Sequence, residues 1–293
     1  MINGQTRTCG IIGNPVKHTI SPIIHNSLAD RCGHNMVYVP FPVEEGNLGD
    51  AVKGAYALDI LGMNVTVPYK SEVIKYLVKV DDLAAGIGAV NTLVRTTGGY
   101  KGYNTDMSGL WRAMSGEGIR IEGEEIILIG AGGAARAVAY LCAKQGAGKV
   151  YLLNRTLEKA KLIADEVNGS FDRAVIEPML LSDHTSLPDK KFLAIQATSV
   201  GLEPHDDEVV IEDEAFYKKV HTGYDLIYKP FNTRFMRLVR EAGGQAYNGL
   251  KMLIYQGIDA YELWNNVKLN AEDVKFVYER IKEEMGLQAE GKA

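Results

Sequence analysis

The 293-residue sequence predicts an α/β protein, with an N-terminal α/β domain followed by a doubly wound domain that has a parallel sheet. Short apolar runs alternate with helical stretches along most of the chain. The continuous apolar run at 126–129 is typical of a strand buried on both faces of a parallel sheet, and a glycine-rich turn follows it directly. Two amphipathic helices with no strand after them close the chain, and we expect them to return to the first domain.

The first hundred residues contain the elements of the N-terminal domain. Apolar runs of strand length lie at 9–12, 37–41 and 63–67. The pair Gly98-Gly99 predicts a hairpin between strands at 92–95 and 100–103. Helical spacing marks 22–32 and 47–57. Ser21 is the natural N-cap of the first of these helices, because Pro22 suits the first helical position.

The second series of elements begins with the strand at 126–129. Further strands are expected at 150–153, 192–197, 223–227 and 245–247. Helices are expected at 134–144, 157–167 and 233–242, and after them at 252–264 and 272–285, where Asn270 is the N-cap of the last one. This alternation predicts βαβ units with right-handed crossovers. We therefore expect one domain at residues 1–105 with 249–293 and the other at 106–248.

Composition and charge exclude several classes of protein. The chain has 32 basic and 37 acidic residues, a net charge of −5, which argues against a nucleic-acid surface. The longest apolar stretch contains three glycines and Arg136, so no membrane span is expected, and the polar N-terminus lacks the apolar core of a secretory signal. Cys9, Cys32 and Cys142 have no paired spacing. They predict neither a disulfide nor a metal site, and they fit a reducing cytoplasm. The sequence does not distinguish a monomer from a homodimer.

The glycine-rich turn matches the GxGxxA fingerprint of a Rossmann dinucleotide site. It consists of Gly130, Ala131, Gly132, Gly133, Ala134 and Ala135. The first glycine allows the tight turn, the second lets the backbone approach a pyrophosphate, and Ala135 lets helix and strand pack closely. The amides at the helix start would then hold the phosphates.

A second signal lies after the next strand, where an NAD-selective site would carry Asp or Glu. The residues there are Asn154, Arg155 and Thr156. Arg155 offers a planar fork to the 2′-phosphate of NADP, and Lys159 adds a second charge one helical turn later. Thr156 would cap the helix that starts at Leu157. The two cations alone are also compatible with a solvated helix face, but their position favours NADP.

Polar side chains gather in the first domain where local structure does not demand them. They are Thr19 and Ser21 before a helix, Asn64, Thr66 and Lys70 along and beyond a strand, and Asn91 and Asp106 in turns. A helix start is also an anion site. Each of these residues has an ordinary structural alternative as a cap, a turn residue or a solvated lysine.

Taken together and in order, the motifs of this chain strongly resemble those of the shikimate dehydrogenase family, including its shikimate/quinate relatives. They are GNPVKHTISPIIHN, NVTVPYK, GAVNT, NTD, GAGGAARA, NRT, ATSVG and GLKMLIYQG. The resemblance covers nearly the whole chain. It implies an NADP-dependent oxidoreductase that reversibly reduces 3-dehydroshikimate to shikimate in chorismate and aromatic amino acid biosynthesis. It also implies an active site in the cleft between two domains.

The resemblance assigns substrate roles residue by residue. Thr19 and Ser21 would bind the carboxylate, Asn64, Thr66, Asn91 and Gln256 the ring hydroxyls, and Tyr228 would approach the cleft. Lys70 and Asp106 correspond to the catalytic pair. The reduction of a ketone also requires such a pair, because hydride transfer to the carbonyl carbon leaves an alkoxide that must be protonated. We expect Lys70 to be the general acid/base and Asp106 to orient it or share the proton, while His18 and His25 are interpreted as structural.

Further cofactor residues are expected mostly in the second domain. Thr198, Ser199 and Gly201 follow a buried strand at the edge of the sheet where dinucleotides bind. Ile227 and Gly249 resemble positions that flank the nicotinamide.

Gln256 lies in an apolar helix, where its amide is costly unless it finds partners, and a bound polyol would supply them.

Five residues depart from the family pattern. They are Thr19 for serine, Gln196 for asparagine, Asn248 for aspartate, Lys251 for glycine and Lys159 for arginine. The first leaves the preference for shikimate or quinate open, and the last leaves NAD use open. The alternatives are therefore a quinate/shikimate dehydrogenase using NAD or NADP, and a non-catalytic NADP-binding sensor. A sensor would be expected to have lost the pair Lys70 and Asp106.

Overall fold

The computed structural model describes residues 2–287, which form two compact units. The first unit comprises the chain up to Gly109 together with the chain from Leu253 onward, and the second is Leu110–Met252. The chain passes between them inside two continuous helices, α4 (Thr105–Gly116) and α9 (Leu250–Asn265). The boundaries expected after 105 and 248 lie near the starts of these helices. Because the chain passes from one unit to the other inside a helix, no loop or linker residues mark the boundary in the sequence.

The first unit contains a mixed six-stranded sheet in the order β2-β1-β3-β5-β6-β4. Its strands are β1 (Arg7–Gly13), β2 (Met36–Pro42), β3 (Gly62–Val65), β4 (Lys79–Val80), β5 (Thr92–Thr96) and β6 (Gly99–Tyr103). The strands β2, β1 and β3 are parallel, whereas β5 and β6 form the antiparallel hairpin that Gly98-Gly99 predicted. The apolar side chains of α2 (Leu48–Ala57) and α3 (Asp82–Ile87) fill the core on one face.

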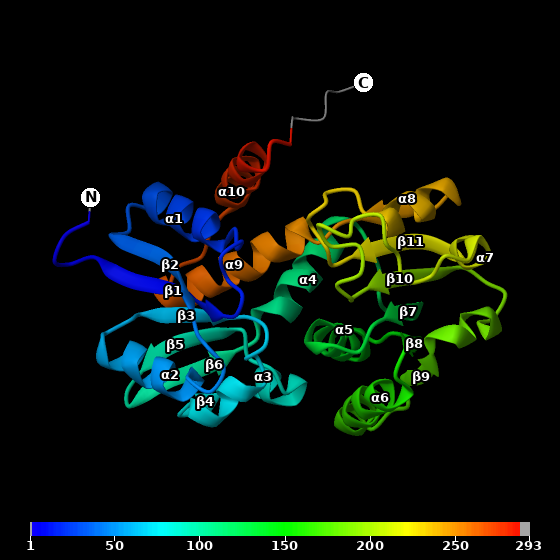
Figure 1. The fold of residues 1–293 in the computed structure, drawn as a ribbon, viewed down its shortest axis with the longest axis horizontal. Coiled ribbons are helices and arrows are strands. Elements are labelled where there is room, and N and C mark those ends of the chain that lie inside the picture. The colour runs from blue at the N-terminus through cyan, green and yellow to red at the C-terminus, as the bar shows by residue number, and fades with distance from the viewer. Residues whose placement is uncertain (1, 288–293) are drawn as a thin grey trace. The chain divides into compact units, whose positions relative to one another are not determined.

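The other face of this sheet is covered by α1 (Ser21–Cys32), α10 (Ala271–Glu284) and the C-terminal part of α9 (Figure 1). Trp264 of α9 lies directly over Gly62, where a Cβ would be 2.1 Å from the indole nitrogen. That nitrogen donates to the Leu93 carbonyl at 2.9 Å. The predicted return of the C-terminal helices to the first domain is therefore confirmed.

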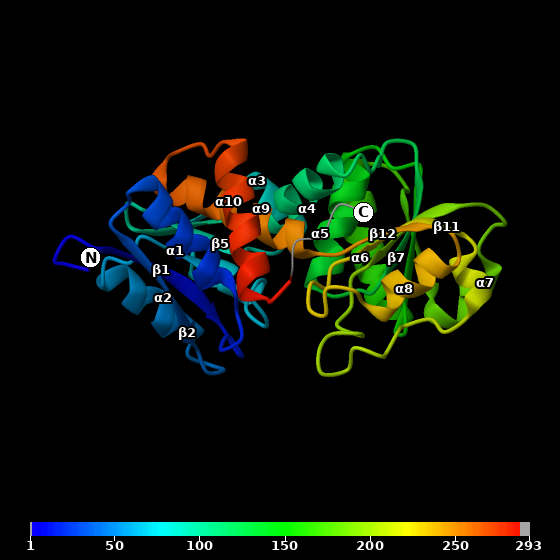
Figure 2. The same ribbon diagram turned by 90° about the horizontal axis from the view of Figure 1, so that it is seen from above.

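The last helix, α10, packs along α1 (Figure 2). Arg31 of α1 donates to the Asp273 carboxylate at 2.5 Å. At its start, Asn270 Oδ1 accepts the amides of Glu272 and Asp273, and Asp273 accepts the Asn270 amide, which is a complete capping box. The N-cap predicted at Asn270 is confirmed.

The capping box gives a stability prediction. We expect Asn270→Ala to lower the free energy of unfolding by about 1 kcal/mol, because two helix amides lose their acceptor. Urea denaturation of this variant is to be compared with that of Glu279→Ala, which alters an exposed residue of the same helix. Equal midpoints for the two variants would contradict a stabilising cap.

The second unit is a parallel six-stranded sheet in the order β12-β11-β10-β7-β8-β9. Its strands are β7 (Glu125–Ile129), β8 (Lys149–Asn154), β9 (Ile176–Leu180), β10 (Phe192–Gln196), β11 (Val220–Asp225) and β12 (Gln245–Tyr247). The strand order reverses between β7 and β10, which is where a doubly wound sheet binds its ligand. The helices α5 (Gly133–Lys144) and α6 (Leu157–Phe171) cover one face, and α8 (Arg234–Glu241) covers the other (Figure 1). This arrangement confirms the predicted fold class.

Several element boundaries differ from the prediction for local reasons. Ser21 is the first residue of α1 and not its N-cap, because the Thr19 hydroxyl accepts the Ser21 amide at 3.2 Å. The strand β11 ends at Asp225, whose carboxylate accepts the Ile227 amide and turns the chain. Its beginning at Val220 was missed because polar residues follow. The edge strand β9 contains Pro178, and the short elements β4, α3 and α7 (Glu214–Tyr217) also lacked a recognisable pattern.

Candidate active site

The turn between β7 and α5 contains one position, Gly130, that no other residue could occupy without strain. Gly130 has a φ of +110°, and a Cβ there would lie 2.9 Å from the Ala197 carbonyl oxygen. Gly132 is the N-cap of α5, and space around its Cβ position is open. Ala135 is fully buried where the helix meets the sheet. The three positions of the fingerprint thus form a tight turn, an accessible backbone and a close packing contact.

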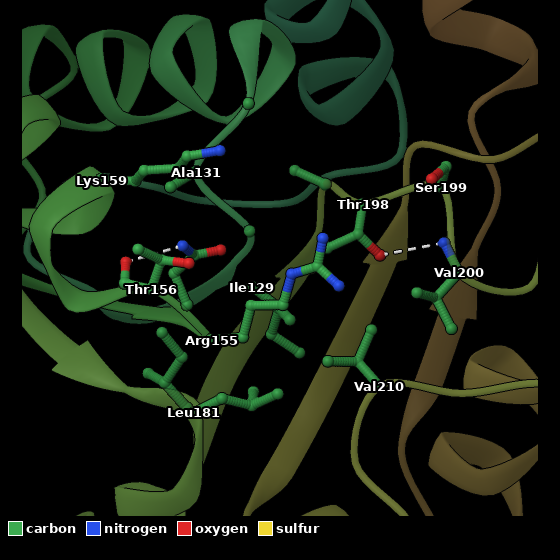
Figure 3. Close-up of a pocket in the computed structure, with 15 residues that line it drawn as sticks. Ile129, Ala131, Arg155, Thr156, Lys159, Leu181, Thr198, Ser199, Val200 and Val210 are labelled. Atoms are coloured by element: carbon green, nitrogen blue, oxygen red, sulfur yellow. Dashed lines mark hydrogen bonds between the residues drawn. The ribbon is translucent and has the colours of Figure 1, made fainter.

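A pocket of about 400 Å³ opens beside this turn, at the carboxyl ends of β7, β8 and β10 (Figure 3). Nine predicted cofactor residues line it: Gly130, Ala131, Gly132, Asn154, Arg155, Thr156, Lys159, Thr198 and Ser199. Six others do not: Gly133, Ala134, Ala135, Gly201, Ile227 and Gly249. Apolar residues missed by the sequence complete the wall: Ile129, Leu153, Leu181, Ala197, Val200 and Val210. An apolar wall residue carries no local signal that distinguishes it from the core.

Two cations face this pocket without an ionic partner. Arg155 and Lys159 are exposed, and neither forms an ion pair within residues 2–287. The Arg155 guanidinium projects into the middle of the pocket toward Thr198 (Figure 3). Arg155 also lines an adjoining hollow of about 440 Å³ with His184. A phosphate group is the kind of ligand that would satisfy such a planar, unpaired fork.

The predicted cap of α6 is only partly right. Thr156 occupies the N-cap position, but its side chain makes no capping hydrogen bond. Instead, the Asn154 side chain donates to the Thr156 carbonyl at 2.8 Å and fixes the turn. The Thr156 side chain therefore accepts no hydrogen bond from the amides at the start of α6. These amides remain available to an anion in the pocket.

Gln196 organises the loop that carries Thr198 and Ser199. Its Oε1 accepts the Thr198 amide at 2.5 Å, and its Nε2 donates to the Val200 carbonyl and to Asp225 Oδ1 at 3.1 and 3.3 Å. Asp225 is completely buried and also accepts the Thr233 hydroxyl at 2.6 Å. The departure at Gln196 thus supplies three hydrogen bonds that hold one wall of the pocket.

Asp225 gives the protein a pH-dependent stability. Burial raises the pKa of Asp225 to about 7, while hydrogen bonds from Thr233 and the Ile227 amide act in the opposite direction. An unfolded aspartate titrates at about pH 4. Between about pH 4 and pH 7 the folded state binds more protons than the unfolded state, so the free energy of unfolding falls as pH rises through this range.

We expect Asp225→Asn to remove this component. Urea denaturation at pH 5 and pH 8 should show that the wild type loses stability relative to the variant at the higher pH. An offset between wild type and variant that is the same at both pH values would contradict a buried, protonated Asp225.

The first unit holds the residues expected to transfer a proton. Lys70 Nζ donates to Asp106 Oδ2 at 2.7 Å, and their side chains are 25% and 13% exposed. The turn that carries Lys70 is anchored by Tyr69, whose hydroxyl donates to the Val43 carbonyl at 2.7 Å. Asp106 lies in the first turn of α4, where the helix dipole favours a carboxylate. The pair is therefore positioned by the turn at Tyr69 and by the start of α4, and it remains partly exposed.

Asn91 supports the pair from the other side. Its Nδ2 donates to Asp106 Oδ1 at 2.9 Å, and its Oδ1 accepts the Thr105 amide at 2.7 Å. Gln256 of α9 reaches the same amide, with Oε1 3.5 Å from Asn91 Nδ2, and its own Nε2 donates to the Leu253 carbonyl. Protein groups therefore already contact both ends of the Gln256 amide, and its contact with a bound polyol stays a prediction.

The remaining predicted substrate residues differ in their surroundings. Thr19 and Ser21 place two hydroxyls 3.0 Å apart at the start of α1. Thr66 packs its methyl group against Gly13, where a Cβ would lie 2.4 Å away. Asn64 is buried among protein hydrogen-bond partners. Tyr228 belongs to the second unit, where burial raises its pKa against the effect of Lys229.

The two histidines of the first motif differ from each other. His25 is completely buried and stacks on Tyr38 with ring centroids 4.2 Å apart. Burial lowers the pKa of His25 to about 3, so the ring stays neutral, and neither of its nitrogens has a hydrogen-bond partner among the described residues. His18 is exposed.

Two more departures have clear structural partners. Asn248 Oδ1 accepts the Leu250 amide at the start of α9, as an aspartate could, and its Nδ2 donates to the Phe231 carbonyl at 2.8 Å. Lys251 forms an ion pair with Glu117 at the end of α4.

Within the described residues, no cluster of histidine, cysteine and carboxylate side chains could hold a metal ion. No helix of that part of the chain is long and apolar enough to cross a membrane.

Two protein-family models match the chain. The model described as the shikimate dehydrogenase substrate binding domain matches residues 11–93. The model described as shikimate / quinate 5-dehydrogenase matches residues 113–199. The two matches fall in the first and second units respectively.

Individual relatives agree with these models. A Methanothermobacter thermautotrophicus protein named shikimate dehydrogenase (NADP+) is 40% identical over 267 residues, which cover 90% of this chain and 93% of that protein. A crystal structure of a shikimate dehydrogenase in complex with NADP+ is 39% identical, with a TM-score of 0.86, and covers 95% of this chain and 96% of that one. A shikimate 5-dehydrogenase from Listeria monocytogenes, in complex with shikimate and NAD, is 31% identical with a TM-score of 0.88 over 96% of this chain and 98% of that one. The chain therefore belongs to the shikimate dehydrogenase family.

Proposed function

We propose that this protein is a shikimate dehydrogenase that reversibly reduces 3-dehydroshikimate to shikimate with NADPH, within chorismate and aromatic amino acid biosynthesis. The observation that carries the proposal is the pair Lys70–Asp106, 2.7 Å apart and held by Asn91 in the first unit. The second unit contributes the dinucleotide turn and its pocket. A hydride transfer between a nicotinamide and a ketone needs both parts. The names of the relatives support this activity.

The reaction converts a ketone into an alcohol by adding a hydride to carbon and a proton to oxygen. NADPH, when bound, supplies the hydride. The Lys70 ammonium donates its proton to the oxygen as negative charge develops there, and Asp106 holds the ammonium in position and stabilises its charge. In the reverse direction, neutral Lys70 accepts the alcohol proton. The proton that accompanies each hydride transfer is thus exchanged at one atom, Lys70 Nζ.

The substrate would be oriented by hydroxyl and amide groups of the first unit. The two hydroxyls of Thr19 and Ser21 suit a carboxylate at the start of α1, where the helix dipole adds to the attraction. Asn91 and Gln256 already meet beside Asp106 and would bind ring hydroxyls, with Asn64 and Thr66 completing the site. Tyr228 would contribute from the second unit.

The cofactor would be held by backbone amides and by the two free cations. The amides after Gly130 suit the pyrophosphate, and Arg155 with Lys159 suits the 2′-phosphate, which distinguishes NADP from NAD. Gly201, Ile227 and Gly249 would lie toward the nicotinamide. The three cysteines are free, which supports a reducing, cytoplasmic location.

A steady-state comparison tests the proposal. We expect kcat/KM to be highest for shikimate with NADP among the four combinations of shikimate or quinate with NADP or NAD. A preference for quinate or NAD would favour a quinate/shikimate dehydrogenase. Binding of NADPH without turnover of any of these substrates would favour a non-catalytic sensor.

A further inference from the structure

Tyr38 of β2 is a buried tyrosine beside the proposed substrate site. Its side chain is 1% exposed and stacks on the ring of His25, with Trp264 5.9 Å away on a tilted plane. Its hydroxyl donates to Asn64 Oδ1 at 2.8 Å. Burial raises the pKa of Tyr38 well above its ordinary value, and a hydrogen bond with Ser21 acts in the opposite direction. The hydroxyl therefore stays protonated and is able to donate to Asn64.

The orientation of the Asn64 amide is fixed by chemistry. Its Nδ2 lies 3.3 Å from the Asn91 main-chain carbonyl, which can only accept, and 3.2 Å from Thr92 Oγ1. The amide nitrogen must therefore face these two groups, and Oδ1 must face Tyr38. The Tyr38 hydroxyl is consequently the donor in that hydrogen bond, and it holds the amide against rotation.

A second amide continues the chain of hydrogen bonds. Asn91 Oδ1 accepts the Thr105 amide at 2.7 Å, which can only donate, so its Nδ2 must face Asp106. Thr92 joins the two amides, since its hydroxyl accepts from Asn64 Nδ2 and donates to Asn91 Oδ1 at 3.1 Å. The chain runs from Tyr38 through Asn64, Thr92 and Asn91 to Asp106 Oδ1.

We propose that Tyr38 and Thr92 are positioning residues for the proton-transfer pair, which they orient through the Asn64 and Asn91 amides. This inference rests on the proposed function, because it assigns the chain to Lys70 and Asp106. Asp106 Oδ1 is engaged by Asn91, so Oδ2 is left to bind the Lys70 ammonium. Asn64, Thr92 and Asn91 are at most 4% exposed, so water does not replace a lost partner easily. Freeing the Asn64 amide would loosen Asn91 and then the carboxylate.

Tyr38→Phe tests the proposal because it removes the hydroxyl and keeps the ring. We expect kcat for shikimate oxidation to fall about tenfold, because small misplacements of a catalytic group are costly, while the KM for NADP stays unchanged and that for shikimate changes less than kcat. The matched control is Tyr100→Phe. Tyr100 is equally buried in the same unit, and its hydroxyl donates to the Ile60 carbonyl at 2.7 Å, outside this chain of hydrogen bonds. Its loss should reduce thermal stability and leave kcat unchanged.

A double-mutant cycle separates positioning from a general loss of stability. In an Asp106→Asn background, Tyr38→Phe should cause no further loss of kcat, because the carboxylate that it orients is gone. A full tenfold loss in that background would overturn the proposal, as would equal kcat values for Tyr38→Phe and Tyr100→Phe.

Thr92 gives an independent test if Tyr38→Phe does not fold. Thr92→Val keeps the shape and removes the hydroxyl, whereas Thr92→Ser keeps the hydroxyl. A loss of kcat with valine that serine restores supports the proposal, and equal kcat values for the two variants overturn it. Lys70→Ala distinguishes this inference from the proposed function. If Lys70→Ala retains full kcat, the assigned acid/base pair fails, whereas if only the Tyr38 and Thr92 variants retain it, the positioning role alone fails.

Discussion

Lys70→Ala is expected to lower kcat for shikimate oxidation by about 10²- to 10⁴-fold while the KM for shikimate changes only modestly. The side chain provides a proton to a developing alkoxide, an interaction that exists only in the transition state. Its ammonium is bound to Asp106 at 2.7 Å, so the substitution removes the proton donor and leaves only the group that positioned it. Initial rates with saturating NADP at several shikimate concentrations separate kcat from KM.

Lys101→Ala provides the matched control for this experiment. Lys101 lies in the same unit and pairs with Asp81 at 3.6 Å, outside the cluster around Asp106. We expect this variant to keep the wild-type kcat. A Lys70 variant that turned over as fast as the Lys101 variant would refute the role of Lys70 as acid and base.

Arg155→Ala is expected to raise the KM for NADPH by about 10- to 100-fold and to leave the KM for NADH nearly unchanged. The reason is that a guanidinium fork without an ionic partner can form charge-assisted hydrogen bonds to a 2′-phosphate, which NADH lacks. Arg155→Lys should restore only part of the affinity, because an ammonium keeps the charge and loses the fork. The measurement is KM for both cofactors at a fixed, saturating concentration of 3-dehydroshikimate.

The control for Arg155 is Lys161→Ala, which removes an exposed cation of α6 that does not line the pocket. We expect both KM values to stay at the wild-type level. Equal increases for NADPH and NADH in the Arg155 variant would exclude a contact with the 2′-phosphate.

Much of the fold could be predicted because its strongest signals are local. The apolar run of β7 and the glycines that follow it specify a buried strand and a tight turn, and both are present. The N-cap at Asn270 was also recognisable from residue type, whereas the capping box that it forms with Asp273 was not predicted. By contrast, β9 was missed because an edge strand with Pro178 and half-exposed side chains lacks a clear period. The boundary at Ser21 was misjudged because the helix begins one residue earlier than expected: Ile20 is the N-cap, and the Thr19 hydroxyl accepts the amide of Ser21 itself.

The sequence predicted only those residues of the candidate site that lie in recognisable motifs. Lys70, Asn91 and Asp106 lie in separate motifs, and the structure brings them into one hydrogen-bonded group. Thr92 and Thr105 lay inside the same motifs but received no role, because the link between two amides depends on side-chain orientation. Leu181 and Val210 of the pocket wall come from segments without any motif. The substrate and cofactor roles of these residues stay predictions until the variants are measured.

Although the first unit contains the N-terminus, its last residues are synthesised after the whole of the second unit. The first unit needs Trp264 over Gly62 and Gln256 beside Asn91, and both residues come from α9, which is made after the whole of the second unit. Domains generally fold as units while the chain emerges from the ribosome. The second unit is therefore the first that can complete its core, whereas the N-terminal segment has only α1 over one face of its sheet until α9 and α10 are made.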